Sequence, residues 1–210
     1  MLSAFPGKRV IVRVLDLDTD KPLPFLILTE SGKYANRGFQ ALLSNIEVLE
    51  TQLEALAESS RRYPETELWV MAPMITSSKQ AKQFVDLAKG YGLEAVGVMI
   101  EVPEVCQEEV LAEILNTVDF VSIGTNDLTQ YTLNLDRVNS AIALSDVRKP
   151  EVLGLIERVI AGSRAASKPV GICGEAAGDP ESAKLFIEYG VTSLSLSPAL
   201  LPGLVRALRN

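Results

Sequence analysis

The chain has 210 residues, 47% of them hydrophobic, and a formal net charge of −7. This length and hydrophobic content predict one well-cored domain over residues 1–210. The acidic balance, without any cluster of Lys and Arg, argues against a nucleic-acid partner, because phosphate binding relies on such clusters.

The apolar runs, the cysteines and the absence of histidine limit where the protein can reside and which catalytic groups it can use. The apolar runs are shorter than the roughly 20 residues that span a bilayer, and residues 1–10 lack a signal-peptide core. Two cysteines, Cys106 and Cys173, indicate reduced thiols, so we expect a cytoplasmic protein without membrane insertion. The absence of histidine excludes Ser-His and Cys-His pairs, imidazole metal ligands and a phosphohistidine within these residues.

Taken in chain order, short β-branched runs alternate with helical patterns. The runs predict strands at 9–16, 68–74, 95–101, 119–125, 168–175 and 193–198. Apolar stripes predict helices over 39–53 and 152–160, while Ser77 or Ser78, Pro150 and Pro180 are typical of helix starts. The alternation implies right-handed βαβ crossovers and a parallel sheet, either an open doubly wound sheet or a (β/α) barrel.

The positions of the polar residues favour the barrel. Every predicted strand ends near a group able to do chemistry: Arg13 and Asp16, Pro73, Glu101, Asn126 and Asp127, Cys173 and Glu175, and Ser197. Functional groups at all carboxyl ends are typical of a barrel's active face, whereas an open sheet concentrates them at one switch point.

Two carboxylates, Glu101 and Asp127, end neighbouring predicted strands, so a barrel directs them to one spot. Mg²⁺ is typically held by one or two carboxylates, with waters and substrate oxygens completing the coordination. Taken singly, a helix cap for Glu101 and an Asx-type turn for Asp127 are the better interpretations. Their joint position at adjacent strand ends favours a metal.

Three arginines, Arg13, Arg37 and Arg137, lie on or just beyond strand ends of an otherwise acidic chain. The planar guanidinium grips carboxylate or phosphate through paired hydrogen bonds, so their convergence predicts a small, multiply charged anion. A surface salt bridge is the better explanation for each one alone. Arg13 is the exception, since it interrupts an apolar strand and would need an anionic partner if it pointed inward.

Cys173 ends a predicted strand between Gly171 and Gly174, where a thiol can exchange a proton with a substrate carbon. Most buried cysteines are inert packing residues, and Cys106 on a helical stretch fits that description. Gly124 allows the strand before it to turn sharply, so that Asn126 and backbone amides can reach an anion.

Three blocks carry a resemblance to a known family: "GVMIEVP" (97–103), "DFVSIGTNDLTQYTLNLDR" (119–137) and "PVGICGEAAGDP" (169–180). They resemble the signature blocks of the phosphoenolpyruvate-utilising enzymes, most closely the barrel domain of Enzyme I of the bacterial sugar phosphotransferase system. Weaker blocks, "VRVLDLDTDKPLPF", "RGFQALL" and "MAPMI", follow the same order, so the resemblance covers nearly the whole chain.

The resemblance implies a (β/α) barrel that binds phosphoenolpyruvate and Mg²⁺ at its C-terminal mouth. Glu101 and Asp127 match the metal ligands, and Cys173 matches the acid/base that protonates C3 of the enolate to give pyruvate. The residues that match those holding the phosphate and carboxylate are Arg13, Arg37, Asn126 and Arg137. The implied partners are a phosphohistidine domain and a phosphocarrier protein. Whether Mg²⁺ or Mn²⁺ is used stays open.

The chain also departs from the family pattern. Two upstream strands, a phosphate-binding Arg in an "RTE" segment and the phosphoacceptor His are missing, which predicts an incomplete TIM-type barrel with six of eight strands. Asp18 and Thr19 replace two glycines, and Gln40 replaces a second Arg. We therefore expect a fragment of a longer enzyme or a shortened paralogue, and exposed strand edges predict a homo-oligomer.

Two other functions remain open at this point. The departures suit a non-catalytic assembly or regulatory descendant. A metal-dependent aldolase or lyase acting on pyruvate or enolpyruvate would also use Glu and Asp on successive strand ends.

Overall fold

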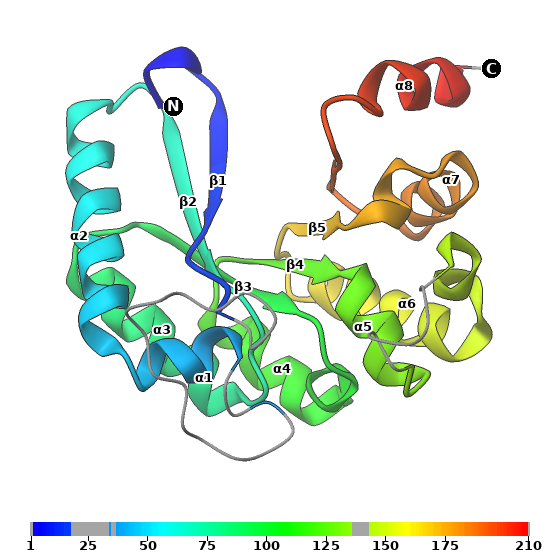
Figure 1. Cartoon of the computed structure of the whole chain (residues 1–210), viewed down its shortest axis with the longest axis horizontal. Helices are drawn as coiled ribbons and strands as arrows, with labels where there is room; N and C mark the ends of the chain where they lie inside the picture. The colour runs from blue at the N-terminus through cyan, green and yellow to red at the C-terminus, as the bar shows by residue number, and fades with distance from the viewer. Residues whose placement is uncertain (1, 18–33, 35–36, 136–142, 210) are drawn as a thin grey trace. The chain divides into compact units, whose positions relative to one another are not determined.

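The computed structural model describes residues 2–17, 34, 37–135 and 143–209. The chain divides into two compact units (Figure 1). The first unit comprises Met1–Met99 with Thr117–Asp119, and the second comprises Ile100–Asn116 with Phe120–Asn210.

The first unit is built on parallel strands that follow one another in chain order: β1 (Arg9–Arg13), β2 (Glu67–Ala72) and β3 (Ala95–Ile100, whose last residue belongs to the second unit). Its helical elements are η1 (Leu2–Ala4), α1 (Gly38–Leu43), α2 (Ile46–Arg62) and α3 (Ser78–Gly90). Figure 1 shows α2 running alongside β1 and β2. Strand and helix alternate as the sequence predicts.

Apolar periodicity explains how these helices pack. α2 buries Leu49, Leu53 and Ala57, which recur every four residues and so share one face. Phe39 of α1 meets Phe84 of α3 edge-to-face, with ring centroids 5.6 Å apart. The core of this unit therefore lies between the helices and the strands.

The second unit repeats the pattern with β4 (Phe120–Gly124), β5 (Val170–Cys173) and β6 (Ser193–Ser195), again parallel and in chain order. Its α-helices are α4 (Glu108–Thr117, the last residue in the first unit), α5 (Thr125–Thr132), α6 (Pro150–Ala165), α7 (Pro180–Tyr189) and α8 (Leu201–Arg209). Short 3₁₀ turns precede several of them: η2 (Pro103–Cys106), η3 (Leu144–Arg148) and η4 (Glu175–Gly178).

Most helix boundaries follow the predicted signals. Ser77 caps α3 by accepting a hydrogen bond from the Gln80 amide, and Pro150 and Pro180 open α6 and α7. α7 ends at Gly190, whose positive φ of 95° suits glycine. The single helix predicted over 39–53 is wrong, because the chain breaks at Ser44 and Asn45 into α1 and α2.

All six predicted strands are present, although each is shorter than its apolar run. Their parallel order and alternation with helices confirm the predicted α/β class. Within the described part of the chain, no helix combines the length and apolar character needed to cross a bilayer.

Candidate functional site

In the first unit, the carboxyl ends of β1 and β2 meet the start of α1. Beyond β1, Val14 donates its amide to Met71 of β2, and the Gly38 amide donates to Leu17 at 2.8 Å. Gly38 itself needs to be glycine, since its φ is +50° and a Cβ there would overlap Met74. Arg37 precedes this glycine and is only 8% exposed. The fold thus brings a buried guanidinium to the ends of these two strands.

Arg13 has an anionic partner within its own segment. Its side chain is 40% exposed and forms an ion pair with Asp16 at 2.9 Å. Arg9, Ile11 and Arg13 share the exposed face of β1, because side chains alternate along a strand. The charge of Arg13 is therefore met by a carboxylate three residues away.

In the second unit, Glu101 follows β3 and is 2% exposed. Its side chain occupies the space beside Gly124, the last residue of β4. A Cβ at Gly124 would lie 2.5 Å from Oε1 and 2.7 Å from Cγ of Glu101. Gly124 is therefore required here to admit a buried carboxylate between neighbouring strand ends.

Asp127 lies in the first turn of α5 and is 8% exposed. This helix begins directly after Gly124, the last residue of β4. Glu101 and Asp127 thus give this end of β4 two buried carboxylates. Carboxylate oxygens are the ligands that Mg²⁺ prefers in proteins. Among the described residues there is no cluster of three or more such ligands.

Asn126 is the second residue of α5, and its side-chain orientation is fixed by the loop after β5. Its Oδ1 accepts a hydrogen bond of 3.3 Å from the Glu175 amide. With the oxygen occupied in this way, the Nδ2 group remains as the donor of the carboxamide. An amide donor at a helix N-terminus is suited to bind an anion.

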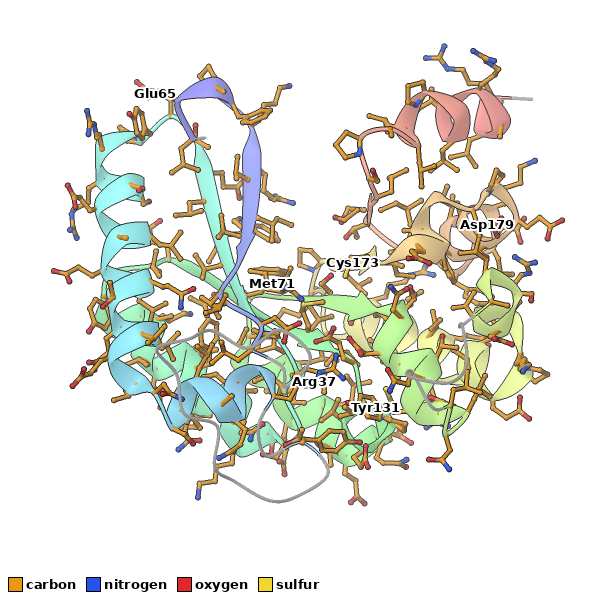
Figure 2. All side chains as sticks on the ribbon, viewed as in Figure 1. Arg37, Glu65, Met71, Tyr131, Cys173 and Asp179 are labelled. Carbon is orange, nitrogen blue, oxygen red and sulfur yellow. The ribbon has the colours of Figure 1, made fainter. Side chains whose placement is uncertain are left out.

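Cys173 ends β5 (Figure 2). In the sheet it pairs with Gly124 of β4. Its Sγ accepts a hydrogen bond from the Ser122 hydroxyl at 3.5 Å, and its S–H donates to the Ile123 carbonyl at the same distance. The thiol is partly exposed. Cys106, in contrast, is buried, and this burial raises the pKa of its thiol to about 12, as expected for a packing residue.

The turn after Cys173 packs tightly on the start of α5. Gly174 has a φ of +114°, and a Cβ there would overlap the Thr125 hydroxyl. Thr125 in turn donates to the Cys173 carbonyl at 3.0 Å. These contacts fix the thiol-bearing end of β5 against the first turn of α5.

The sequence reasoning did not single out Ser122 or Thr125. Ser122 interrupts the buried run "FVSIG", and a polar residue within a continuously apolar parallel strand is the signal that could have revealed it. It lies two residues before Gly124, hence on the same face of β4. Arg137, the third predicted anion-binding arginine, lies outside the described residues.

The comparison with protein families shows the family of the chain. Residues 1–210 match the family described as "PEP-utilising enzyme, PEP-binding domain". The chain belongs to the phosphoenolpyruvate-utilising enzyme family. Buried carboxylates, an oriented asparagine and a strand-end thiol thus lie in a phosphoenolpyruvate-binding domain of that family.

Named relatives support the membership. The chain is 43% identical over 206 residues to the phosphoenolpyruvate-protein phosphotransferase of Streptomyces coelicolor, covering 96% of this chain and 36% of the relative. It is 35% identical to the Haemophilus influenzae protein of the same name, covering all of this chain and 38% of the relative. A multiphosphoryl transfer protein of Xanthomonas campestris is 38% identical, with 26% of its length covered. The chain thus spans between 26% and 38% of the length of these relatives.

Solved structures share the fold at low sequence identity. A citrate lyase from Burkholderia xenovorans superposes with a TM-score of 0.58 at 15% identity, over 77% of this chain and 52% of that one. A citrate lyase beta subunit from M. tuberculosis superposes with a TM-score of 0.53 at 16% identity, over 96% of this chain and 73% of that one. These likenesses confirm the TIM-type (β/α) barrel class, with six strands in the described part of the chain where a complete barrel has eight.

Proposed function

We propose that this chain binds phosphoenolpyruvate together with Mg²⁺ and forms part of a transferase. The phosphoryl group passes to a histidine of another domain or protein, and pyruvate is released. Family membership supports phosphoenolpyruvate binding. The observation that carries the proposal is the buried Glu101 carboxylate against Gly124, beside the helix that bears Asp127.

Glu101 and Asp127 are the residues that would hold the metal. Both are nearly buried, and both supply the hard oxygen atoms that a small divalent cation takes. The bound ion supplies positive charge at the phosphate oxygens of the substrate. The role of the two carboxylates would therefore be to retain the ion at this end of β4.

Asn126 serves as a donor to the phosphoryl group. Because the Glu175 amide occupies Oδ1, the Nδ2 hydrogens are free of that contact and can donate to a phosphoryl oxygen. A phosphoryl group in transfer needs alignment and charge stabilisation more than covalent help from the protein. A fixed carboxamide provides both without reorganisation.

Cys173 is the proton donor to carbon. When the bond between phosphorus and the enol oxygen breaks, the electron pair stays on that oxygen and leaves the enolate of pyruvate. C3 of the enolate then takes the proton of the Cys173 thiol, which becomes a thiolate. The Ser122 hydroxyl already donates to this sulfur and stabilises the negative charge that develops there.

The arginines neutralise the remaining charge of the ligand. Arg37 is buried next to the ends of β1 and β2, and it matches a family residue that holds the ligand. We assign Arg13 and Arg137 to the same ligand on the family resemblance. Arg13 would have to leave its ion pair with Asp16 in order to bind the ligand.

The phosphoryl acceptor lies outside these residues, since the chain contains no histidine. The relatives are named for transfer to a protein and for multiphosphoryl transfer, and these names support a phosphohistidine domain and a phosphocarrier as partners. A homo-oligomer is supported by β1 and β6, each of which pairs with a single strand in the described part of the chain. A concentration-independent monomer mass by light scattering would contradict it.

Isothermal titration of the folded chain tests the binding. Phosphoenolpyruvate titrated in the presence of Mg²⁺ should give a saturable heat, and chelation of the metal should weaken it. Pyruvate is the matched control, because it lacks the phosphoryl group that Asn126 contacts. If phosphoenolpyruvate gives no saturable heat, either with Mg²⁺ or after chelation of the metal, the proposal is refuted.

A further inference from the structure

One guanidinium joins two turns of the second unit that are far apart in sequence. Arg148, the last residue of η3, approaches Asp179 with Nη1 2.6 Å from Oδ2. The same Nη1 lies 3.0 Å from the Ser182 hydroxyl, and Nη2 lies 3.0 Å from Glu181. Asp179 precedes α7 (Figure 2). Arg148 thus binds the start of α7 through three side chains.

Asp179 is a well-fixed anchor for this contact. Its Oδ2 also accepts hydrogen bonds from the Ser182 amide at 3.0 Å and the Ser182 hydroxyl at 2.7 Å. Burial acts to raise the pKa of Asp179, but these bonds and the Arg148 charge outweigh it and hold the pKa below its ordinary value. Asp179 is therefore an anion at neutral pH, and it cannot shift without breaking the cap of α7.

The η4 turn begins at Glu175, next to the proposed anion site, and ends at Gly178, directly before Asp179. Its amides bond back within the turn, from Ala177 to Gly174 and from Asp179 to Ala176. At the start of the turn, the Glu175 amide donates a hydrogen bond to the Oδ1 of Asn126. The turn is short and internally bonded, so a displacement of Asp179 is transmitted to Glu175. Arg148 fixes one end of a rigid segment whose other end orients Asn126.

We propose that Arg148 is a positioning residue for the anion site. Through Asp179 and the η4 turn, it keeps the Glu175 amide in place, and that amide turns the Nδ2 of Asn126 toward the ligand. This inference rests on the proposed function, because it assigns the oriented carboxamide to phosphoenolpyruvate. A merely structural salt bridge at the cap of α7 would stabilise the fold and leave Asn126 unaffected.

The test compares Arg148→Met with Arg164→Met. Arg164 lies on α6 and donates to the Tyr189 carbonyl at 3.3 Å, so it contacts the opposite end of α7. Two quantities are measured for each variant: the hydrogen exchange rate of the Glu175 amide without ligand, and the Kd for phosphoenolpyruvate with Mg²⁺. We expect Arg148→Met to increase both about tenfold, as is typical of coupling between linked sites. Arg164→Met should change each by about twofold or less.

Arg148→Lys serves as the rescue variant, because it keeps one cationic contact to Asp179. It should restore Glu175 exchange and affinity toward wild-type values. If Arg148→Met lowers the thermal stability but leaves Glu175 exchange equal to that of Arg164→Met, the positioning role is overturned. Failure of the wild-type chain to bind phosphoenolpyruvate would instead refute the proposed function, while Glu175 exchange, measured without ligand, still decides the role of Arg148.

Discussion

The substitution Gly124→Ala tests whether the buried carboxylate of Glu101 has a functional position. Gly124 has φ −90° and ψ 95°, values that alanine also adopts, so backbone strain does not enter. The three atoms nearest to the new methyl group all belong to the Glu101 side chain, at 2.5 Å for Oε1, 2.7 Å for Cγ and 2.9 Å for Cδ. The change therefore acts on one carboxylate.

The size of the displacement sets the expected effect. Heavy atoms pack at separations of about 3.5 Å, so Glu101 must retreat by roughly 0.5 to 1 Å. Metal–ligand distances tolerate only about 0.2 Å, and disturbed ligand positions typically weaken metal affinity about tenfold to hundredfold. Crowding of this kind costs about 1–3 kcal/mol in stability. We expect a folded protein with a large loss of metal-dependent binding.

The assay is isothermal titration of phosphoenolpyruvate with and without Mg²⁺, with thermal unfolding in parallel. Gly154→Ala is the control, because Gly154 lies in α6 and a Cβ there meets no atom within 4 Å. That variant should bind as the wild type does and gain about 0.4–1 kcal/mol in stability. If Gly124→Ala retains wild-type, metal-dependent affinity, the reasoning about Glu101 is refuted.

Two further predictions concern single groups. Ellman's reagent at pH 8 should label the native chain once, at Cys173, because the pKa of Cys106 is about 12; labelling of the Cys173→Ser variant before it unfolds would contradict this. Asp179→Asn should lower the free energy of unfolding by about 1.5–3 kcal/mol at pH 7, since a hydrogen-bonded charge is lost. The pKa of Asp179 is depressed in the folded state, so its contribution is present above the unfolded value of about 3.9 and is lost as pH falls through the folded value. Denaturant titrations should therefore show the gap between wild type and variant closing below about pH 4, and a constant gap would argue against an ionised Asp179.

The strands were predictable because parallel strands covered on both faces are continuous apolar runs. The exact ends of the strands were not predictable from the sequence. The run at 9–16 predicted a strand through Asp16, yet β1 stops at Arg13 while Val14 and Leu17 remain buried beyond it. Apolar residues of a buried connection have the same pattern as apolar residues of a strand, so periodicity does not separate them.

The helix break after Leu43 has a similar cause. The apolar positions of α1 and α2 keep one continuous stripe across Asn45, which precedes α2 with φ −131°. The strand predicted over 119–125 ends one residue early, because α5 begins at Thr125 directly after Gly124. Leu128 and Thr129 of this helix are buried.

The candidate site was only partly accessible from sequence. The sequence singled out Glu101 and Cys173 because each ends a predicted strand, and the strand ends follow from the order of elements along the chain. The exposed direction of Arg13 depends on which face of β1 is covered, and that face is set by packing between elements. The hydrogen bond from Ser122 to Cys173 depends on the register of β4 with β5, which pairs Gly124 with Cys173. A one-residue shift would turn Ser122 to the other face.

The most direct test of the account is a Mn²⁺ titration followed by electron paramagnetic resonance, with phosphoenolpyruvate present. The account predicts a single tight site per chain, weakened about tenfold or more by Glu101→Gln and by Asp127→Asn. The exposed Glu104, three residues from Glu101, provides the control variant Glu104→Gln, which should bind as the wild type does. Wild-type Mn²⁺ affinity in both Glu101→Gln and Asp127→Asn would contradict the claim that these carboxylates share one ion.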